Sequence, residues 1–283
     1  MAYVGTNYAG WQRQAEAVSV QQVLEEALSR LSDEPVKVVG AGRTDGGVHA
    51  VGQVASFCMN REWDPGRLVL AANFYLPPDV SLMSARRVPD DFDARRSAMW
   101  REYRYFIWHS RSCWPHLRDM VWWRKRQWNA DSVREACRIL EGRHDFRAFC
   151  KTGECPEESV RTITRLRYKK IGSLSIVIAR APSFLTNMVR IIVGSLDRVG
   201  CGEEPASWLS GLLGENGAGG EPHRKFSGAT APACGLYLWR AAYEDVNFYR
   251  PMQEFRRSKP CLELTSVSTL ERPQLSYLKK GAE

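Results

Sequence analysis

The chain has 283 residues, of which 44% are hydrophobic, enough for the core of one large domain or of two fused ones. Its 40 Lys and Arg residues against 32 Asp and Glu residues give a net charge of +8 and a pI near 9.1, which favours a polyanionic partner. The sequence has no apolar run that could cross a bilayer and does not open on a basic stretch followed by an apolar one. We therefore expect no membrane partner and a cytoplasmic location.

The eight cysteines are scattered, which excludes the common zinc motifs. They form no Cys-x-x-Cys pair, and no histidines stand at a matching spacing. The closest two, Cys150 and Cys155, have four residues between them and no second pair downstream. We expect reduced thiols and no metal site.

The first predicted element is a helix over 19–31, because its apolar residues recur at helical spacing. Ser19 and Gln22 have the spacing of a capping box at its start. Short β-branched strands are then predicted over 36–39 and 51–58, on either side of a glycine-rich loop over 40–49. This loop is thus expected to be held by two strands.

The rest of the chain mixes strands with packed helices. The predictions are, in order, a strand over 103–108, a helix over 131–141, strands over 160–168 and 174–179, a helix over 184–199 and a strand over 235–243. Residues 214–220 are glycine-rich and predict a flexible connection, and the polar, proline-broken residues 250–283 predict a disordered tail. This mixture predicts an α+β fold.

Asp45 lies in the glycine-rich loop, between Thr44 and Gly46. Four glycines within the eight residues 40–47 let the backbone approach a ligand closely, and a carboxylate held there is expected at the mouth of a cleft. An aspartate in such a loop can instead do no more than accept hydrogen bonds from the amides of a tight turn. The loop alone leaves both interpretations open.

The string Gly42 to Ala50, GRTDGGVHA, closely resembles the G-R-T-D-A-G-V-H-A signature of the TruA family of tRNA pseudouridine synthases. Further blocks that resemble family motifs stand around it in the family's order, namely Tyr3 to Gln12 (YVGTNYAGWQ), Asn73 to Pro77 (NFYLP), Asp91 to Arg95 (DFDAR), Arg101 to Tyr105 (REYRY), His144 to Phe146 (HDF), Phe184 to Arg190 (FLTNMVR) and Ala231 to Leu238 (APACGLYL). The resemblance extends from Tyr3 to Tyr243, most of the chain.

This resemblance implies the pseudouridine synthase fold, in which two fused α/β halves surround a central, mostly antiparallel sheet with flanking helices. It implies an N-terminal half over 1–98 that carries the catalytic loop and a C-terminal half over 99–249, followed by the tail over 250–283. The implied protein is a homodimeric enzyme without a cofactor that isomerises uridines in the anticodon stem-loop of tRNA, at positions 38–40.

The resemblance also implies the residues of the site. Asp45 is the carboxylate that attacks or removes a proton, Arg190 pairs with it, and Tyr103 stacks on the target base. Leu236 lines the uracil pocket, and Arg43 stands beside the displaced nucleotide. A guanidinium next to a carboxylate in a dry pocket stabilises its charged form. From periodicity alone, Arg190 could instead be a surface arginine on an amphipathic helix.

Arginines and lysines outside the motif loop are candidates for phosphate contacts, which would position the RNA without reading its bases. Each of them can equally belong to a solvated face of the protein. They are Arg86, Arg87, Arg95, Arg96, Arg101, Arg104, Arg124, Lys125 and Arg126.

The chain departs from the family pattern in two places. Only Met1 and Ala2 precede the block that starts at Tyr3, so we expect part of a central strand to be missing. Gly46 replaces the usual alanine, which adds unfolded-state entropy to the loop. These departures motivate an alternative, a catalytically weakened RNA-binding or RNA-folding paralogue.

A third hypothesis is a hydrolase with Asp45 as nucleophile, and His49 is the one residue at a recognisable spacing that could act as its partner. His49 is more simply interpreted as a structural residue of the loop.

Overall fold

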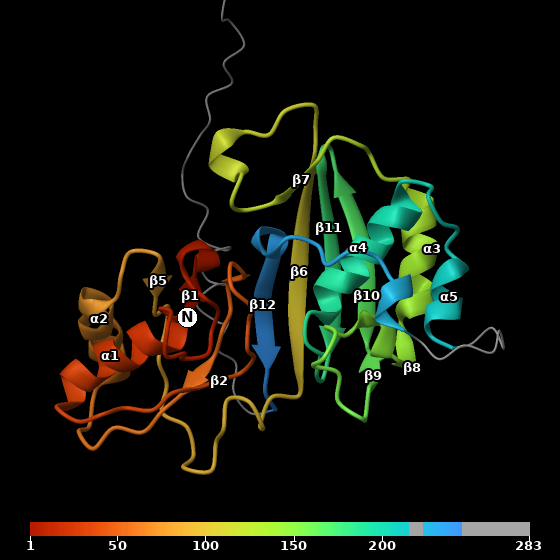
Figure 1. Cartoon of the computed structure of the whole chain (residues 1–283). Coiled ribbons are helices and arrows are strands. Elements are labelled where there is room, and N and C mark those ends of the chain that lie inside the picture. The colour runs from red at the N-terminus through yellow and green to blue at the C-terminus, as the bar shows by residue number, and fades with distance from the viewer. Residues whose placement is uncertain (215–222, 245–283) are drawn as a thin grey trace, which may run out of the picture. The chain divides into compact units, whose positions relative to one another are not determined.

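A mixed sheet runs through the middle of the molecule (Figure 1). The computed structural model describes residues 1–214 and 223–244, all within one compact unit. The predicted tail and all of the predicted flexible connection except Gly214 lie outside the described residues. The boundary between halves at residues 98 and 99 stays a prediction.

The described strands of this sheet follow one path with a single branch. The order is β10 (Arg165–Ile171), β11 (Leu174–Ala181), β6 (Trp100–His109), β12 (Leu236–Ala242), β3 (His49–Ala50), β1 (Ala2–Tyr3) and β5 (Val80–Ser81), and β7 (Trp122–Arg124) pairs with β6 off this path. Only the pairs β12–β3 and β6–β7 are parallel. The sheet is therefore mostly antiparallel, as predicted.

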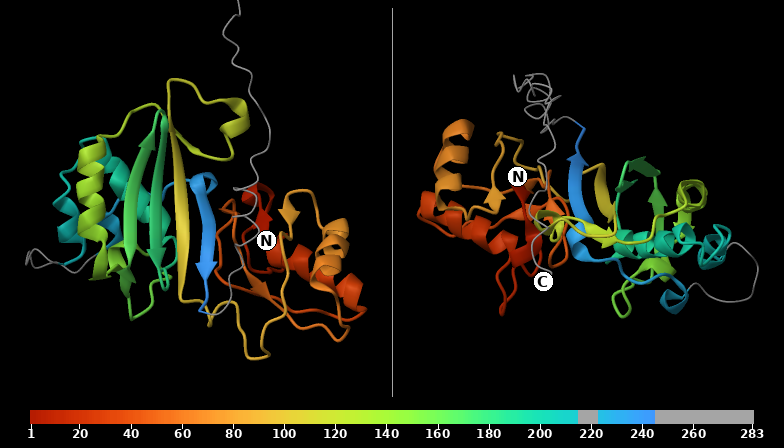
Figure 2. Two further views of the ribbon diagram at one scale, coloured as in Figure 1. Left: turned by 180° about the vertical axis from the view of Figure 1, so that it is seen from behind. Right: turned by 90° about the horizontal axis from the view of Figure 1, so that it is seen from above.

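The helices lie in two groups. Helices α1 (Val20–Ser32) and α2 (Pro65–Tyr75) contact each other beside β1 and β5. Helices α3 (Ala130–Leu140), α4 (Met188–Gly200) and α5 (Trp208–Leu212) lie on one side of β6, β10 and β11 (Figure 2). This arrangement, helices packed against a largely antiparallel sheet, confirms the predicted α+β class.

Alternation along the long central strand explains this layering. In β6 the side chains of Tyr103, Tyr105 and Ile107 are buried, whereas Arg104 and Phe106 between them stay partly exposed. Successive side chains of a strand point to opposite faces, so one face of β6 belongs to the core and the other does not. The burial of Tyr103 on the core side brings it toward the motif loop described below.

Two of the predicted helices begin where their sequence signals indicate, and one begins later. The Ser19 hydroxyl accepts a hydrogen bond from the Gln22 amide at 3.2 Å, which caps α1 as predicted. Helix α3 lies within one residue of its predicted bounds. Helix α4 starts at Met188, four residues after the predicted start, because Asn187 has left-handed backbone angles (φ 60°, ψ 5°).

The strands predicted beside the motif loop are mostly wrong. Strand β2 is only Val39–Gly40, and it pairs with β4 (Ala55–Ser56). Before β2, the amides of Val36 and Val38 donate to the side chains of Ser29 and Glu25 on α1, and these bonds replace a strand ladder. Strand β3, which joins the main sheet, lies at the end of the predicted loop.

The strand predicted over 160–168 is also divided. Strand β9 (Val160–Ile163) pairs with β8 (Gly142–Asp145) in a separate ribbon, and β10 starts at Arg165. Short 3₁₀ turns occur at Gly5–Asn7, Pro115–Leu117, Arg147–Phe149, Arg224–Phe226 and Ala233–Gly235. Within the described part of the chain, no helix is both long and apolar enough to span a bilayer.

Candidate active site

The backbone of Asp45 is fixed by the segment around Gly10. Gly10 and Asp45 form an isolated antiparallel bridge, and the amide of Trp11 donates to the Thr44 carbonyl at 2.9 Å. Gly10 has a φ of 114°, and a Cβ atom there would lie 2.6 Å from the Thr44 oxygen. Only glycine allows this approach without displacing the loop. The first block of the resemblance thus serves to hold the second.

Asp45 and Arg190 form an ion pair, although 145 residues separate them in the chain. Arg190 Nη1 donates to Asp45 Oδ2 at 2.9 Å. The side chain of Asp45 is 37% exposed and that of Arg190 is 17% exposed, so the carboxylate opens to solvent while its partner is mostly covered. A guanidinium keeps its charge at every physiological pH, and it therefore offers the carboxylate a permanent positive neighbour.

Two further contacts hold the Arg190 side chain in place. Its Nε donates to the Ala231 carbonyl at 2.8 Å, and Nη1 also donates to Asn187 Oδ1 at 3.2 Å. The amide of Ala231 in turn donates to the Arg190 carbonyl at 3.1 Å. The guanidinium is therefore anchored by two elements besides the loop of Asp45.

Tyr103 lies on β6 and packs beneath the motif loop. Its ring is 8% exposed and meets Phe184 edge to face, with 5.2 Å between the ring centroids. Its hydroxyl donates to the Arg43 carbonyl at 3.5 Å. Burial, and next the negative charge of Asp45, raise the pKa of Tyr103 above its usual 10. The phenol is thus neutral near Asp45 at physiological pH.

Arg43 and Leu236, the other two predicted site residues, differ in exposure. Arg43 is exposed, and its backbone carbonyl contacts Tyr103. Leu236 is 5% exposed at the start of β12, where it pairs with Tyr105 across the sheet. The roles assigned to both residues stay predictions.

His49 is buried in the fold and has both ring nitrogens occupied. Nδ1 accepts a hydrogen bond from the Gly5 amide at 3.0 Å, so Nε2 carries the proton and donates to the Cys234 carbonyl at 3.1 Å. The ring stacks on Tyr237 with 4.6 Å between centroids. These contacts favour the structural interpretation of His49 and leave the hydrolase hypothesis without a base.

The protonation of His49 leads to a prediction about stability. Burial lowers its pKa from the usual 6.5, so the native protein holds a neutral ring. The unfolded chain binds a proton near its ordinary pKa, and the free energy of unfolding should therefore decrease as the pH falls from about 7.5 to about 5.5. Urea unfolding at both pH values is expected to show a smaller decrease for His49→Gln than for the wild type. An equal decrease in the free energy of unfolding of both proteins would contradict this. Both proteins are expected to lose some stability at low pH, because burial also lowers the pKa of His109.

Three of the arginines proposed for phosphate contacts are partly buried and have partners within the protein, and exposed Arg87 also pairs with Glu62 at 3.7 Å. Arg101 donates to the carbonyls of Ala41 and Pro182, at 2.9 and 2.8 Å. Arg104 pairs with Glu102, and Arg124 with Asp197. The other six, Arg86, Arg87, Arg95, Arg96, Lys125 and Arg126, are exposed.

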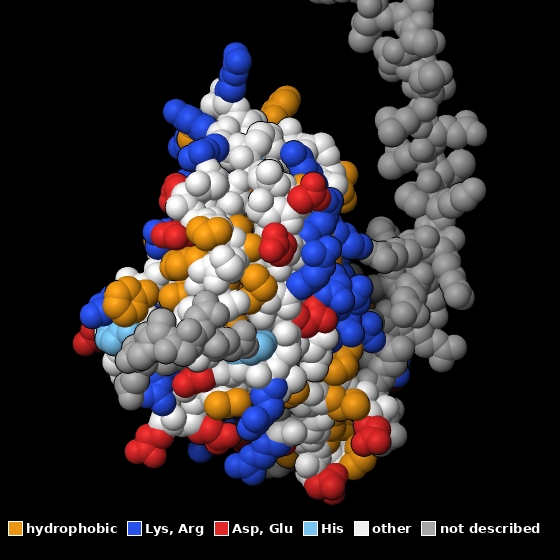
Figure 3. Space-filling model, turned by 90° about the vertical axis from the view of Figure 1, so that its right-hand side faces the viewer, with side chains coloured by type: hydrophobic (Ala, Val, Ile, Leu, Met, Phe, Trp, Pro, Cys, Tyr) orange, Lys and Arg blue, Asp and Glu red, His pale blue; other side chains and the backbone are white. Residues whose placement is uncertain are grey.

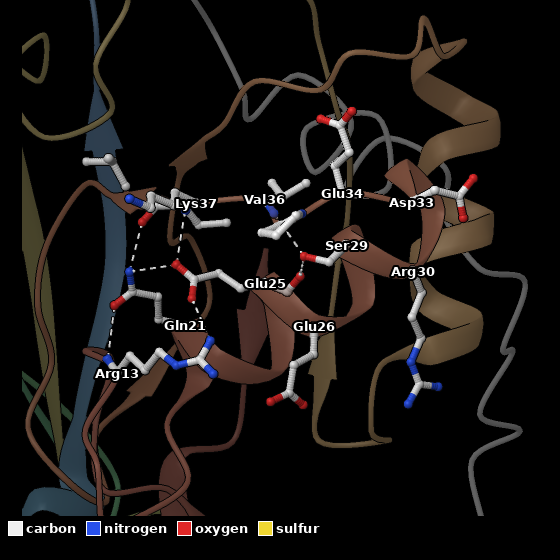
Figure 4. A pocket seen from close by; sticks show the side chains of 13 residues that line it. Arg13, Gln21, Glu25, Glu26, Ser29, Arg30, Asp33, Glu34, Val36 and Lys37 are labelled. Carbon is white, nitrogen blue, oxygen red and sulfur yellow. Dashed lines mark hydrogen bonds and ion pairs between the residues drawn. The ribbon is translucent and has the colours of Figure 1, made fainter.

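A hollow of about 980 Å³ lies away from these residues, between α1 and the segment that leads to β2 (Figure 4). Glu25 is the central side chain there, and it accepts hydrogen bonds from Arg13, Gln21 and the Val38 amide. These bonds tie the segment to the helix, so the acid has a structural role. None of the predicted site residues lines this hollow. Among the described residues, no group of three His, Cys, Asp or Glu side chains could hold a metal ion.

Sequence reasoning missed Asn187 and Phe184 as neighbours of the site. Both belong to the block from Phe184 to Arg190, which resembles the family pattern F-L-x-x-M-V-R, and this pattern specifies no residue at position 187. The signal that was available is an asparagine just before a helix, a residue type that tolerates left-handed backbone angles. The hydrogen bond from Arg190 to its side chain depends on that backbone, which a periodicity argument does not reveal.

Comparisons with known proteins identify the family of the chain. A family model described as tRNA pseudouridine synthase matches residues 1–95 and 136–244. A tRNA pseudouridine synthase A from Beijerinckia indica subsp. indica is 41% identical over 255 residues, which cover 89% of this chain and 95% of that protein. Proteins of the same name from Bartonella tribocorum and Pseudomonas aeruginosa are 39% and 41% identical; the matches cover 86% and 85% of this chain, and 97% and 83% of those proteins.

Among solved structures, a Cbf5-Nop10-Gar1 complex matches with a TM-score of 0.31 and 10% identity, over 71% of this chain and 54% of that one, too distant to support an argument. The family model and the relatives are sufficient to assign the family, because the matches include both the loop of Asp45 and the helix of Arg190. The chain belongs to the tRNA pseudouridine synthase family, in its TruA branch, and has the pseudouridine synthase fold.

Proposed function

We propose that this protein is a tRNA pseudouridine synthase that converts uridines of the anticodon stem-loop, at positions 38–40, to pseudouridine in the cytoplasm. The observation that carries the proposal is the ion pair of Asp45 and Arg190 at 2.9 Å, formed by two separate blocks of the family resemblance. The same ion pair argues against the alternative of a catalytically weakened RNA-binding paralogue. A protein that only binds RNA does not need a mostly buried arginine paired with a partly exposed aspartate.

The reaction is an isomerisation at one nucleotide. The bond from N1 of uracil to C1′ of the ribose breaks, the base turns, and a bond from C5 to C1′ forms. N1 takes up a proton, and C5 loses its hydrogen to solvent. Nothing is oxidised or reduced. Attack on the sugar, attack on the ring and removal of a sugar proton all need a carboxylate in its charged form, and Arg190 places a positive charge 2.9 Å from the Asp45 carboxylate.

The target uridine has to leave the base stack to reach Asp45. An aromatic ring that receives it recovers roughly 1–3 kcal/mol of stacking. Tyr103 is the candidate for this platform, because its hydroxyl reaches the loop of Asp45 through the Arg43 carbonyl. In this proposal Leu236 contributes apolar surface to the uracil pocket, and the exposed Arg43 stands beside the displaced nucleotide.

The charge of the surface supports a polyanionic substrate. Figure 3 shows Lys and Arg side chains gathered in a band on the side of the molecule where β10 forms the edge of the sheet. Strand β10 itself alternates buried residues with exposed Arg165, Arg167 and Lys169. Such charges add affinity through phosphate contacts and counterion release.

A homodimer is part of the proposal, following the family resemblance. On the side of the sheet away from α3, α4 and α5, Phe106 and Ile176 pair across strands and keep partial exposure, and Ile171 is 63% exposed. No helix within the described residues covers this side of the sheet, which also carries the basic side chains of β10 (Figure 2). Analytical ultracentrifugation of the wild type should give twice the mass of one chain.

The function is tested with tRNA transcripts that carry tritium at C5 of uridine. The wild type is expected to release tritium from a transcript with uridines at positions 38–40, and none when cytidines replace them. Binding without release would establish the RNA-binding alternative, whereas free uracil or a cleaved backbone would establish a hydrolase. If tritium is still released from the transcript with cytidines at positions 38–40, the enzyme modifies uridines at other positions of the tRNA.

A further inference from the structure

Asn187 has an unusual backbone for a residue with a side chain. It stands directly before α4 with a φ of 60°, and among the described residues only Asp33, beyond the end of α1, is another non-glycine residue with a positive φ. Left-handed angles are unfavourable for an ordinary residue, and asparagine adopts them more readily than most residue types. Glycine would adopt these angles freely, so a side chain at this position is expected to make a contact that glycine could not make.

The side chain of Asn187 meets the guanidinium of the ion pair. Its Oδ1 accepts a hydrogen bond from Arg190 Nη1 at 3.2 Å, and the same Nη1 donates to Asp45 Oδ2 at 2.9 Å. The Asn187 carbonyl accepts the Ile191 amide at 3.0 Å, so the residue is also tied into the first turn of the helix. The amide oxygen and the carboxylate therefore share one nitrogen.

The other anchor of Arg190 leaves a freedom that Asn187 removes. The bond from Nε to the Ala231 carbonyl holds one edge of the planar guanidinium, and tilting of the whole plane about that bond would still move Nη1. A neutral amide oxygen restrains that motion without competing for the positive charge, as a carboxylate would. Thr186, the preceding residue, accepts the Lys151 amide at 3.0 Å and so ties this turn to the loop after Phe149.

We propose that Asn187 is a positioning residue of the isomerisation, which uses its left-handed backbone to hold Arg190 Nη1 against the reacting carboxylate. The inference rests on the proposed function of Asp45 and Arg190. Asn187 acts through Arg190 and touches no reacting atom. A displacement of about 1 Å in a catalytic group can cost a factor of about 100 in rate, so the loss of one of several restraints should cost about tenfold.

The test compares Asn187→Gly with Asp33→Gly in single-turnover tritium release and in tRNA binding. Both changes put glycine at a left-handed position, so they share the backbone effect, but Asp33 is exposed and lies away from the site. Asn187→Gly is expected to lower the rate about tenfold with the Kd for tRNA within about twofold of the wild type, and Asp33→Gly to leave both unchanged.

A double-mutant cycle separates positioning from a general structural role. In an Arg190→Lys background, Asn187→Gly should lower the remaining rate by less than about twofold, because the guanidinium that it restrains is gone. Asn187→Asp, made in the protein that retains Arg190, should also lower the rate, since its carboxylate competes with Asp45 for Arg190.

Three outcomes overturn the inference while leaving the proposed function intact. They are an unchanged rate in Asn187→Gly, an equal loss in both backgrounds, and an effect on tRNA binding alone. A wild type that releases no tritium overturns the proposed function itself. A thermal melt of each variant shows whether it is folded. If Asn187→Gly does not fold, the rate of Asn187→Asp tests the inference instead, and an unchanged rate in that variant overturns it.

Discussion

Changing Asp45 to asparagine is expected to reduce tritium release to less than about one thousandth of the wild-type rate. Asparagine has the same shape and keeps an oxygen that can accept from Arg190, but it carries no negative charge. All three routes to pseudouridine use that charge, so none can proceed. The measurement is single-turnover release with tRNA bound to saturation, which separates chemistry from binding.

Asp131→Asn is the matched control, because Asp131 is 92% exposed in the first turn of α3 and pairs only with Arg134. Its rate should stay within about twofold of the wild type. The melting temperature of Asp45→Asn should remain near that of the wild type, since the isosteric side chain preserves the loop. A folded Asp45→Asn protein that isomerises uridine at a normal rate would remove Asp45 from the chemistry.

Changing Arg190 to glutamine is expected to lower the single-turnover rate about 100-fold. The change removes the positive charge 2.9 Å from Asp45 Oδ2 and the anchor to the Ala231 carbonyl. Without that charge, Asp45 loses the partner that balances its carboxylate and fixes its orientation. Arg190→Lys keeps the charge without the fork of donors and should lose less activity.

Arg198→Gln provides the comparison on the same helix, because Arg198 pairs with Glu204 and covers the ring of Trp208 rather than facing the site. It should leave the rate within about twofold of the wild type. If Arg190→Gln and Arg198→Gln slow the reaction equally, helix α4 contributes only stability and the ion pair has no catalytic importance.

The sequence predicted the fold class, and it predicted the bounds of α1 and α3 to within one residue. The apolar stripe of α1 and the cap at Ser19 are local features, and local features survive in the folded chain. The failures lie around the motif loop, where Val36 and Val38 bond to side chains of α1 and no strand forms. These partners are side chains of the preceding helix, 7 and 13 residues earlier in the chain, and a pattern of β-branched residues carries no information about them.

The candidate site divides in the same way. Asp45 and Arg190 came from motif blocks, because their identity is what the chemistry requires. The contacts that hold them were not accessible, since the bridge to Gly10 and the bond to Asn187 depend on two unusual backbone conformations. His49 illustrates the same limit: only the buried bonds of its two nitrogens decide between base and scaffold.

The parallel pairing of β3 with β12 joins segments that are far apart in the chain, with Tyr237 opposite His49 and Leu238 opposite Ala50. During synthesis on the ribosome, β12 emerges long after the loop of Asp45 has left the exit tunnel. Contacts of such high sequence separation form slowly. The growing chain therefore carries Asp45 for most of translation without β12, and we expect activity only after this strand, the last one among the described residues, has docked beside β3.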